Sequence, residues 1–525
     1  MKKDICVHPA DRGLPPLVAE RVPGREDAPP PLTPWGLVRT LRQEGVAGYI
    51  RRRRLAWLQT FLVAGAIFSI SFGLYAGLSY NRFGQPSEDT HFVYQAHAFR
   101  QGQLHLLSPP PHGNDWASVL SLPVRGGETL RGIWLDREAG KFKTLSGDIY
   151  IIKAQDRDLS RPQELTYYVS FPPGPAVLMM PFIPAVDSPG VDLRDPRKLG
   201  LNDVQFTLFF AALNVLLFFF VLERLRRFGV STRSTRDNVI LTVLFGAGTN
   251  VLWCSILGQV WFTALVIGIT FTLLYIWASI GTRHPLLAGL FLAMAFATRT
   301  PLAFSFVFFA YFLFFPDGRL RRSEWGSFLW KSVLFAAPIL AVGFSLMWFN
   351  QARFDNPFEF GHTYLAQGGI TRIQRYGLFN YHFLSKNLLA AFALLPRIQL
   401  YEPYVLLSKH GMSLFLTTPP LLYLLAYRSG CRPLDRKWFW ALVLALAAVA
   451  VPGLFYQNTG WVQYGFRFSL DYTPYMILLL ALNRRRIGWI FVTLMVVGIV
   501  VNVFGAVTFG RMEMFYEDWL IDPDR

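Results

Sequence analysis

The hydrophobic pattern of this chain is a series of long apolar runs separated by short polar connectors. A helix needs about 20 apolar residues to cross the ~30 Å hydrocarbon layer of a bilayer, and most of the runs approach that length. The pattern predicts an all-α polytopic membrane protein with about eleven transmembrane helices. Their predicted limits are 55–80, 203–222, 239–257, 259–280, 285–298, 300–315, 328–350, 411–428, 438–456, 466–483 and 487–509.

The positions of the charges predict how these helices are oriented. The 525 residues carry a net charge of +17, and the cations gather in short connectors such as Arg51 to Arg54 and Arg484 to Arg486. Short loops rich in arginine and lysine stay on the cytoplasmic side of a membrane. We therefore expect a multi-pass protein of the plasma (inner) membrane with a cytoplasmic N-terminus. The cations report topology, so no nucleic-acid partner is expected.

The segments between the spans divide the chain into four parts. Residues 1–50 are rich in proline and are expected to form a disordered cytoplasmic tail. A transmembrane module is expected at 51–350, with a long external loop at 81–171. A second external loop is expected at 351–410, and residues 411–525 hold the last transmembrane helices and a short external tail. Because the large loops are external, an extracytoplasmic active site is expected.

One apolar segment, residues 172–186, is too short for a full crossing. Five prolines interrupt it, and each removes a backbone donor and obstructs a helix. We expect this segment to re-enter the membrane or to lie half-buried on the outer side.

Two adjacent carboxylates follow the first predicted span. Glu88 and Asp89 precede "HFVYQAHAFRQGQ", residues 91–103, which is predicted to form an interfacial amphipathic helix with Tyr94 and His97 on one face. Acidic side chains suit the N-terminal end of a helix dipole, so the pair could serve only to cap this helix. The alternative is that one carboxylate acts as a base at the membrane surface.

Two arginines lie within or beside predicted spans. An arginine in mid-membrane costs about 2.5–3.5 kcal/mol, so Arg299 should face a cavity or a partner unless it reaches the lipid headgroups. Arg467 stands one helical turn before Asp471, and the two could neutralise each other. Otherwise both arginines are candidates to bind a phosphate, which a guanidinium grips with two hydrogen bonds.

Aromatic and polar side chains are mixed in two further external segments, 348–387 and 456–475. Sugar rings are bound by flat apolar faces together with hydrogen-bonding edges, which this composition provides. An aromatic belt at the membrane interface has a similar composition, and that alternative stays open. The candidate ligands are Arg375 for a phosphate, and Tyr376, Trp461, Gln463 and Tyr464 for a substrate.

These constellations are compatible with one reaction. A sugar on a membrane-bound prenyl phosphate already carries a good leaving group, so the reaction needs cations for the departing phosphate and one carboxylate to deprotonate an acceptor hydroxyl. Glycoside hydrolases use two cooperating carboxylates at a fixed separation, whereas neighbours such as Glu88 and Asp89 point apart. No metal site and no cofactor are predicted, although a divalent cation could bind the external carboxylates.

At these residues the chain resembles the GT-C superfamily of membrane glycosyltransferases, nearest to the branch of protein O-mannosyltransferases and aminoarabinose transferases. The similar motifs are "EDTHFVYQAHAFRQGQLHL", "YYVSFPPGPAVLMMPF", "AFATRTP", "RFDNPFEFG" and "GWVQYGFRFSLDYTP". The resemblance implies a GT-C-like bundle, a polyprenyl-phosphate sugar donor, inversion at the anomeric carbon, and Asp89 as the base. It also implies that Tyr168, in the second motif, is a candidate for substrate binding. The aminoarabinose branch has a lysine where this chain has Phe171, so its phosphate must be bound by other cations.

Two other function classes stay open. A flippase or transporter for a lipid-linked glycan would share cations and aromatics within a bundle, but transporters usually contain internal repeats, and none is evident here. A catalytically silent partner subunit of a glycosyltransferase would fit the substitution at Phe171. For the transferase, the expected partners are membrane lipids, the lipid-linked donor, and a glycan, lipid or protein acceptor.

Overall fold

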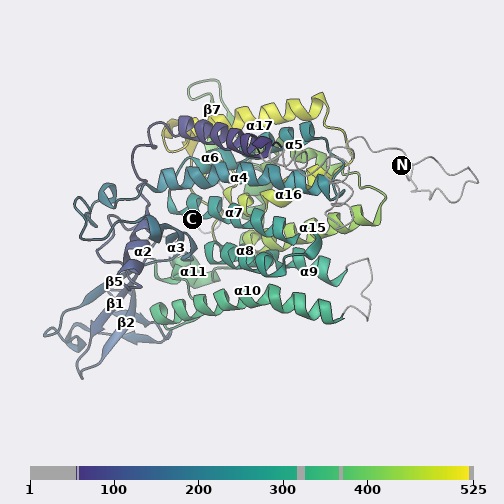
Figure 1. The fold of residues 1–525 in the computed structure, drawn as a ribbon. Coiled ribbons are helices and arrows are strands. Elements are labelled where there is room, and N and C mark those ends of the chain that lie inside the picture. Colours follow the sequence, from purple (N-terminus) through teal and green to yellow (C-terminus); the bar gives the residue numbers. More distant parts are fainter. Residues whose placement is uncertain (1–54, 56–57, 316–324, 366–369, 520–525) are drawn as a thin grey trace, which may run out of the picture.

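A computed structural model describes residues 55, 58–315, 325–365 and 370–519 of the chain. The predicted tail at 1–50 and the last residues of the predicted external tail lie outside the described residues. Within them, most of the chain is helical, and the helices form one elongated bundle (Figure 1).

Six helices are long and apolar enough to cross a membrane, as expected for a membrane-embedded protein. They are Leu58–Leu78, α4 (Asp203–Arg227), α7 (Val260–Ser279, extended by a short turn to Thr282), α10 (Trp325–Phe354), α15 (Pro433–Leu454) and α17 (Trp489–Thr508). Three shorter apolar helical segments accompany them: α8 (Pro285–Thr298), η6 with α9 (Thr300–Ser305 and Phe306–Phe314), and α16 (Thr473–Leu482). The predicted number of about eleven spans is not confirmed.

Two of the predicted spans are interrupted. Residues 239–257 form α5 (Thr235–Ala247) and α6 (Val251–Ser255), which are separated at Gly248. Residues 411–428 form the short helices α13 (Leu414–Thr417) and α14 (Leu422–Leu425), with the 3-10 turn η11 (Pro419–Leu421) between them. Pro419 and Pro420 lie between these two helices, where they cannot donate the backbone hydrogen bonds that would continue α13. Hydropathy alone does not register such interruptions.

The two ends of the bundle are chemically different. At one end, here called the basic end, Arg432 donates to the backbone carbonyl of Gly229, and Arg484 contacts Thr232 and Asp435. The basic connectors after α4, before α15 and before α17 therefore meet there.

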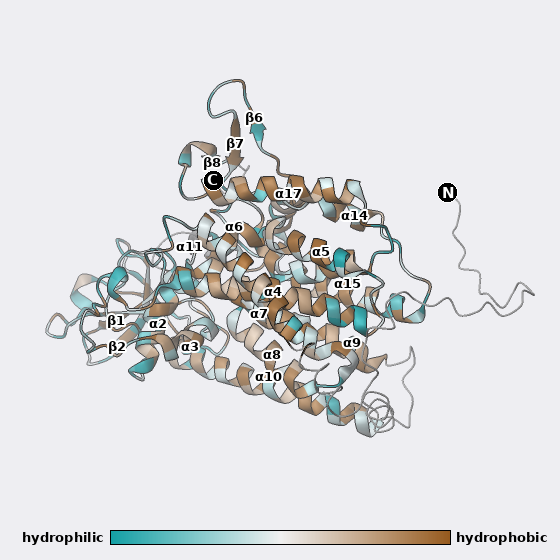
Figure 2. Ribbon diagram, turned by 45° about the horizontal axis from the view of Figure 1, so that its top comes forward, coloured by the Kyte–Doolittle hydropathy of each residue, from teal (hydrophilic) through white to brown (hydrophobic). Residues whose placement is uncertain are grey.

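At the other end, here called the loop end, α4 and α7 begin and α10 and α17 end. The 81–171 segment lies at this end (Figure 1). Figure 2 shows the contrast between the apolar bundle and the more hydrophilic loop end.

The 81–171 segment folds around a β-sheet that the sequence analysis did not predict. Five antiparallel strands lie in the order β4-β3-β2-β1-β5. Their bounds are β1 (Trp116–Pro123), β2 (Thr129–Asp136), β3 (Lys141–Thr144), β4 (Ile149–Ile151) and β5 (Glu164–Val169). The prediction of an all-α protein is therefore wrong for this segment. A second small sheet contains β6 (Arg397–Ile398), β7 (Val405–Ser408) and β8 (Tyr516–Glu517).

The predicted interfacial helix exists as α2 (His91–Arg100), but it does not present an apolar face to a membrane. Residues from His91 to Ala98 are all buried within the protein. Helix α3 (Gly174–Met179) packs against α2, as does β5. The description of α2 as an interfacial amphipathic helix is therefore corrected, because protein rather than lipid covers it.

The proline-rich segment 172–186 contains α3, and this short helix reaches the bundle at one glycine. A Cβ atom on Gly174 would lie 2.7 Å from the carbonyl oxygen of Ala297 in α8. Only glycine permits such an approach of two backbones. The segment is thus anchored to the end of α8, and α3 is only six residues long.

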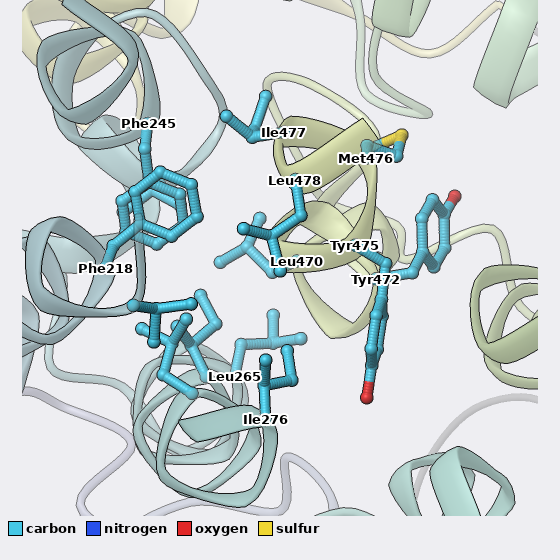
Figure 3. Packing of buried hydrophobic residues seen from close by; sticks show 14 of the residues in the cluster. Phe218, Phe245, Leu265, Ile276, Leu470, Tyr472, Tyr475, Met476, Ile477 and Leu478 are labelled. Atoms are coloured by element: carbon cyan, nitrogen blue, oxygen red, sulfur yellow. The ribbon is translucent and has the colours of Figure 1, made fainter. Parts of the chain in front are cut away.

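The core is centred on α16, a ten-residue helix in which every residue is buried. Phe218 of α4 and Phe245 of α5 stack at 4.3 Å between ring centres. Figure 3 shows these rings facing Leu470, Ile477 and Leu478, with the rings of Tyr472 and Tyr475 on the opposite side of α16. Because α16 is enclosed by other helices, the short turn that precedes it, η12 (Arg467–Asp471), is held deep in the protein.

Candidate functional site

A cavity of about 580 Å³ lies where the bundle meets the loops of the loop end. Its walls come from α7, α8, η6, α10, α15 and η12, and from the loops that contain Asp115, Phe171 and His362. The aromatic residues of its wall are Phe171, Trp261, Phe296, Phe358, Phe360, Phe379, Tyr456, Trp461, Phe466, Phe468 and Tyr472. Such a cavity can hold a ligand that combines apolar and polar parts.

The two adjacent carboxylates have different surroundings. Glu88 is exposed, whereas Asp89 is only 5% exposed. Neither side chain caps α2, because the N-cap residue is Thr90 and no side chain caps it through a hydrogen bond. The capping alternative is therefore not supported, and the two residues cannot have equivalent roles.

Asp89 joins two segments of the site. Its Oδ2 accepts a hydrogen bond from Gln259 Nε2 at 2.7 Å, and its Oδ1 accepts one from Asn114 Nδ2 at 3.2 Å. His112 Nε2 lies 3.5 Å from the same Oδ1. Burial raises the pKa of the Asp89 carboxyl, against the lowering effect of His112 and of the two amide donors. Asp89 is not among the residues that line the cavity.

The position of Gln259 depends on a glycine. Gly258 has a φ of +75°, in the left-handed region, and a Cβ atom there would lie 2.5 Å from Val204 Cγ2. This turn lets α7 begin at Val260, whose amide donates to the Asp89 carbonyl at 3.0 Å. The start of α7 is therefore fastened to Asp89 through both backbone and side chain.

Two carboxylates line the cavity, Asp471 and Asp115, and Asp115 was not among the predicted site residues. Its Oδ2 accepts a hydrogen bond from Trp261 Nε1 at 2.7 Å. Its φ is +55°, which costs a non-glycine residue energy and is tolerated best by aspartate and asparagine. In the sequence Asp115 is one acid in a polar loop, and no motif distinguishes it.

Arg299 and Asp471 form an ion pair on the cavity wall. The guanidinium donates from Nε to Oδ1 at 2.6 Å and from Nη2 to Oδ2 at 2.7 Å. The alternative of an Arg467–Asp471 pair is therefore wrong, because Asp471 pairs with an arginine distant in sequence. Arg299 lines the cavity as predicted, but its charge is already balanced.

Arg467 lines the same cavity and has no such partner. Its side chain is 6% exposed, and its Nε is buried without a hydrogen-bond acceptor. No acceptor for its guanidinium is found in the described part of the chain, where its contacts are aromatic. The guanidinium carbon lies 5.2 to 5.8 Å from the ring centres of Phe262, Trp261 and Phe468. A buried charge without a counter-ion is costly, which points to an anionic ligand.

The predicted substrate contacts after residue 370 are only partly brought together. Trp461 lines the cavity. Gln463 and Tyr464 are buried and committed elsewhere: Gln463 Nε2 donates to two carbonyls, and the Tyr464 hydroxyl donates to the Val501 carbonyl. Arg375 and Tyr376 are not part of the cavity wall.

Three predicted contacts near the β-sheet are also placed away from the cavity wall. Tyr94 is buried edge-on against Trp116, and His97 Nε2 lies 2.7 Å from the Leu199 carbonyl oxygen. Tyr168 packs edge-on against Phe354. The contact of Tyr168 joins the 81–171 segment to α10, whereas that of Tyr94 lies within the segment and that of His97 reaches the loop before α4.

His362 is a further cavity residue that was not among the predicted ligands. It lies on the cavity wall beside Phe171, with 5.9 Å between ring centres. Burial lowers the pKa of its imidazole, and the negative charges of Asp115 and Glu359 oppose that effect. A neutral imidazole there can donate or accept a hydrogen bond.

Within the described ranges, no group of three His, Cys, Asp or Glu side chains is arranged to hold a metal ion. No protein-family model matches this chain, no curated protein is similar to it, and no solved structure matches it. The function is therefore inferred from the geometry of the cavity.

Proposed function

We propose that the protein is an inverting glycosyltransferase with a GT-C-like bundle, which moves a monosaccharide from a polyprenyl-phosphate carrier to an acceptor hydroxyl. The observation that carries this proposal is the buried guanidinium of Arg467, which has no counter-ion among the described residues and lies in a cavity with aromatic walls. An anionic group would compensate its charge. Among biological anions, a phosphate joined to both a sugar and a lipid suits the remaining walls.

The apolar part of the cavity supports a lipid-linked donor. Phe296 of α8, Leu346 and Met347 of α10, and Val449 of α15 line it. Helices α10 and α15 are long and apolar enough to cross a membrane, and α8 is a shorter apolar helix. A prenyl chain would therefore extend from the cavity toward the surrounding lipid. A water-soluble sugar nucleotide would gain nothing from this wall.

The chemistry needs a cation and a base. The acceptor oxygen attacks the anomeric carbon from the face opposite the phosphate, and the carbon–oxygen bond to the phosphate breaks. The electron pair leaves with the polyprenyl phosphate, whose charge Arg467 stabilises. The hydroxyl proton goes to a carboxylate of the 81–171 segment, for which the sequence predicts Asp89. The acceptor is a glycan, a lipid or a protein on the extracytoplasmic face of the plasma (inner) membrane.

The test is sugar release or transfer from a panel of labelled polyprenyl-phosphate monosaccharides by the full-length protein in lipid nanodiscs. Arg467→Gln should bind polyprenyl phosphate about 10- to 100-fold more weakly, since it loses charge-assisted hydrogen bonds worth about 1.5–3 kcal/mol. The matched control is Arg436→Gln at the basic end, where the side chain is exposed.

Two results would contradict the proposal. If the folded wild type releases no sugar yet moves a labelled lipid-linked glycan between leaflets, the protein is a flippase. If it does neither but forms a stable complex with an active transferase, it is a silent partner subunit.

A further inference from the structure

Two carboxylates line the cavity, those of Asp115 and Asp471, and Asp471 is paired with Arg299. The carboxylate left to act on a ligand is therefore that of Asp115, not that of Asp89, which the sequence motif indicates. Asp115 belongs to the cavity wall, as does Arg467. His362 also lines this cavity, and Trp261 lies between the other two groups: its Nε1 is 2.7 Å from Asp115 Oδ2, and its ring centre is 5.6 Å from the Arg467 guanidinium carbon. A sugar phosphate bound to Arg467 would therefore have Asp115 nearby.

The hydrogen bonds of the two aspartates point to different roles. Both oxygens of Asp89 accept hydrogen bonds from side-chain amides, those of Gln259 and Asn114. Only Oδ2 of Asp115 accepts one, from Trp261, and no described residue donates to its Oδ1. This Oδ1 is therefore available on the cavity wall to take a proton, whereas each oxygen of Asp89 already accepts a hydrogen bond and Asp89 does not line the cavity.

Asp89 instead orients two residues that face the cavity, Asp115 and Trp261. The two amides that donate to Asp89 are close to them in sequence: Asn114 directly precedes Asp115, and Gln259 is two residues before Trp261. Asp89 thus connects the loop that contains Asp115 to the start of α7, which contains Trp261. The positive φ of Asp115 requires such support, because strained backbone persists only where its surroundings hold it.

We propose that Asp115 is the base that accepts the proton of the acceptor hydroxyl, and that Asp89 is a positioning residue that holds the Asp115–Trp261 pair. This inference rests on the proposed glycosyl transfer. The Asp115 carboxylate becomes a carboxylic acid as the acceptor oxygen bonds to the anomeric carbon and the phosphate leaves with its electron pair. Product release then returns the proton to water.

The test compares Asp115→Asn, Asp89→Asn and the double variant in the full-length protein, with the exposed Asp187→Asn as the matched control. Sugar release from the polyprenyl-phosphate panel and binding of polyprenyl phosphate are measured separately. Asp115→Asn should lower kcat about 100- to 10,000-fold, the usual contribution of a general base, with donor binding within about twofold of wild type. The asparagine can still accept from Trp261, which protects the fold.

In the wild type, kcat/KM should fall at acid pH as the base becomes protonated. Asp89→Asn should lower kcat by only about 10-fold and should show the same fall in kcat/KM at acid pH, because the base is still present. Asp115→Asn should lose that fall. The double variant should be no slower than Asp115→Asn alone, since positioning has no effect once the base is absent.

The inference is overturned if Asp115→Asn keeps wild-type turnover while Asp89→Asn loses activity and the fall of kcat/KM at acid pH. If Asp115→Asn lowers the unfolding temperature, Asp115→Glu provides the second variant, and turnover in Asp115→Glu no higher than in Asp115→Asn would equally overturn it. A wild type that releases no sugar overturns both the proposed function and this inference, whereas an active wild type with an active Asp115→Asn overturns this inference alone.

Discussion

The two ends of the helix bundle hold their charges in different ways. At the basic end, Asp435 accepts from Arg432 at 2.6 Å and from Arg484 at 3.0 Å, and these arginine side chains are 46% and 32% exposed. At the loop end, the Arg299 side chain is 15% exposed in its pair with Asp471. Arg467 is buried there with no described counter-ion.

This difference shows that the number of cations does not mark a binding site. The basic end has many arginines, but water and nearby acids screen them, so they require no ligand. The loop end has few buried cations, and each must be compensated by the protein or by a ligand. Arg299 illustrates the first case and Arg467 the second, although both lie on one cavity wall.

The largest predicted effect is on stability and compares a carboxylate from each end. Asp471→Asn should lower the free energy of unfolding by about 3–5 kcal/mol, because it leaves Arg299 buried without a full counter-charge. Asp435→Asn should cost about 1 kcal/mol or less, since its arginines reach water. Unfolding of both variants in the same detergent measures the difference. Equal losses would show that the two ends do not differ in this respect.

An intermediate effect is expected for a change that keeps the charge of Arg467. Arg467→Lys retains the cation but loses the planar fork that grips two phosphate oxygens. Loss of about 1 kcal/mol should weaken polyprenyl-phosphate binding about fivefold, less than the loss in Arg467→Gln. Titration with polyprenyl phosphate, with Arg436→Lys as the control, measures this. Equal binding by Arg467→Lys and Arg467→Gln would argue against two hydrogen bonds to phosphate.

The sequence predicted the helical membrane character, and it singled out Arg299 and Arg467, which both line the cavity, because an arginine in an apolar segment is visible without a structure. It did not predict that Asp471 would form its ion pair with Arg299 rather than with Arg467. Arg299 is 172 residues from Asp471 along the chain, whereas Arg467 is only one helical turn away, and tertiary packing alone decides between them.

Other features carried no sequence signal. In the two longest strands of the β-sheet, β1 and β2, burial does not alternate along the whole strand, so a period of two is hard to recognise. Asp115 became a candidate only when the fold placed it on the cavity wall. Conversely, Gln463 and Tyr464 looked like ligands in the sequence, and their hydrogen bonds to backbone carbonyls assign them to the core.

The smallest predicted effect separates the neighbours Glu88 and Asp89 by stability rather than by turnover. Burial raises the pKa of Asp89 above its ordinary value of 3.8. The folded protein then binds this proton more tightly than the unfolded chain does. The resulting stabilisation is complete below about pH 3.8 and is lost as pH rises through the folded pKa. The amide introduced by Asp89→Asn does not titrate. The unfolding temperature of this variant should therefore be a few degrees above that of the wild type near pH 7 and equal to it near pH 3.5.

Thermal unfolding of the wild type, Asp89→Asn and Glu88→Gln across this pH range measures the effect. Glu88→Gln should track the wild type throughout, because the Glu88 side chain is exposed. A stabilisation of Asp89→Asn that did not depend on pH would contradict the sign derived from burial. Together with the slower sugar release expected of Asp89→Asn, stabilisation at neutral pH would mean that the charged form of Asp89 lowers stability while it holds Asp115 and Trp261 in place.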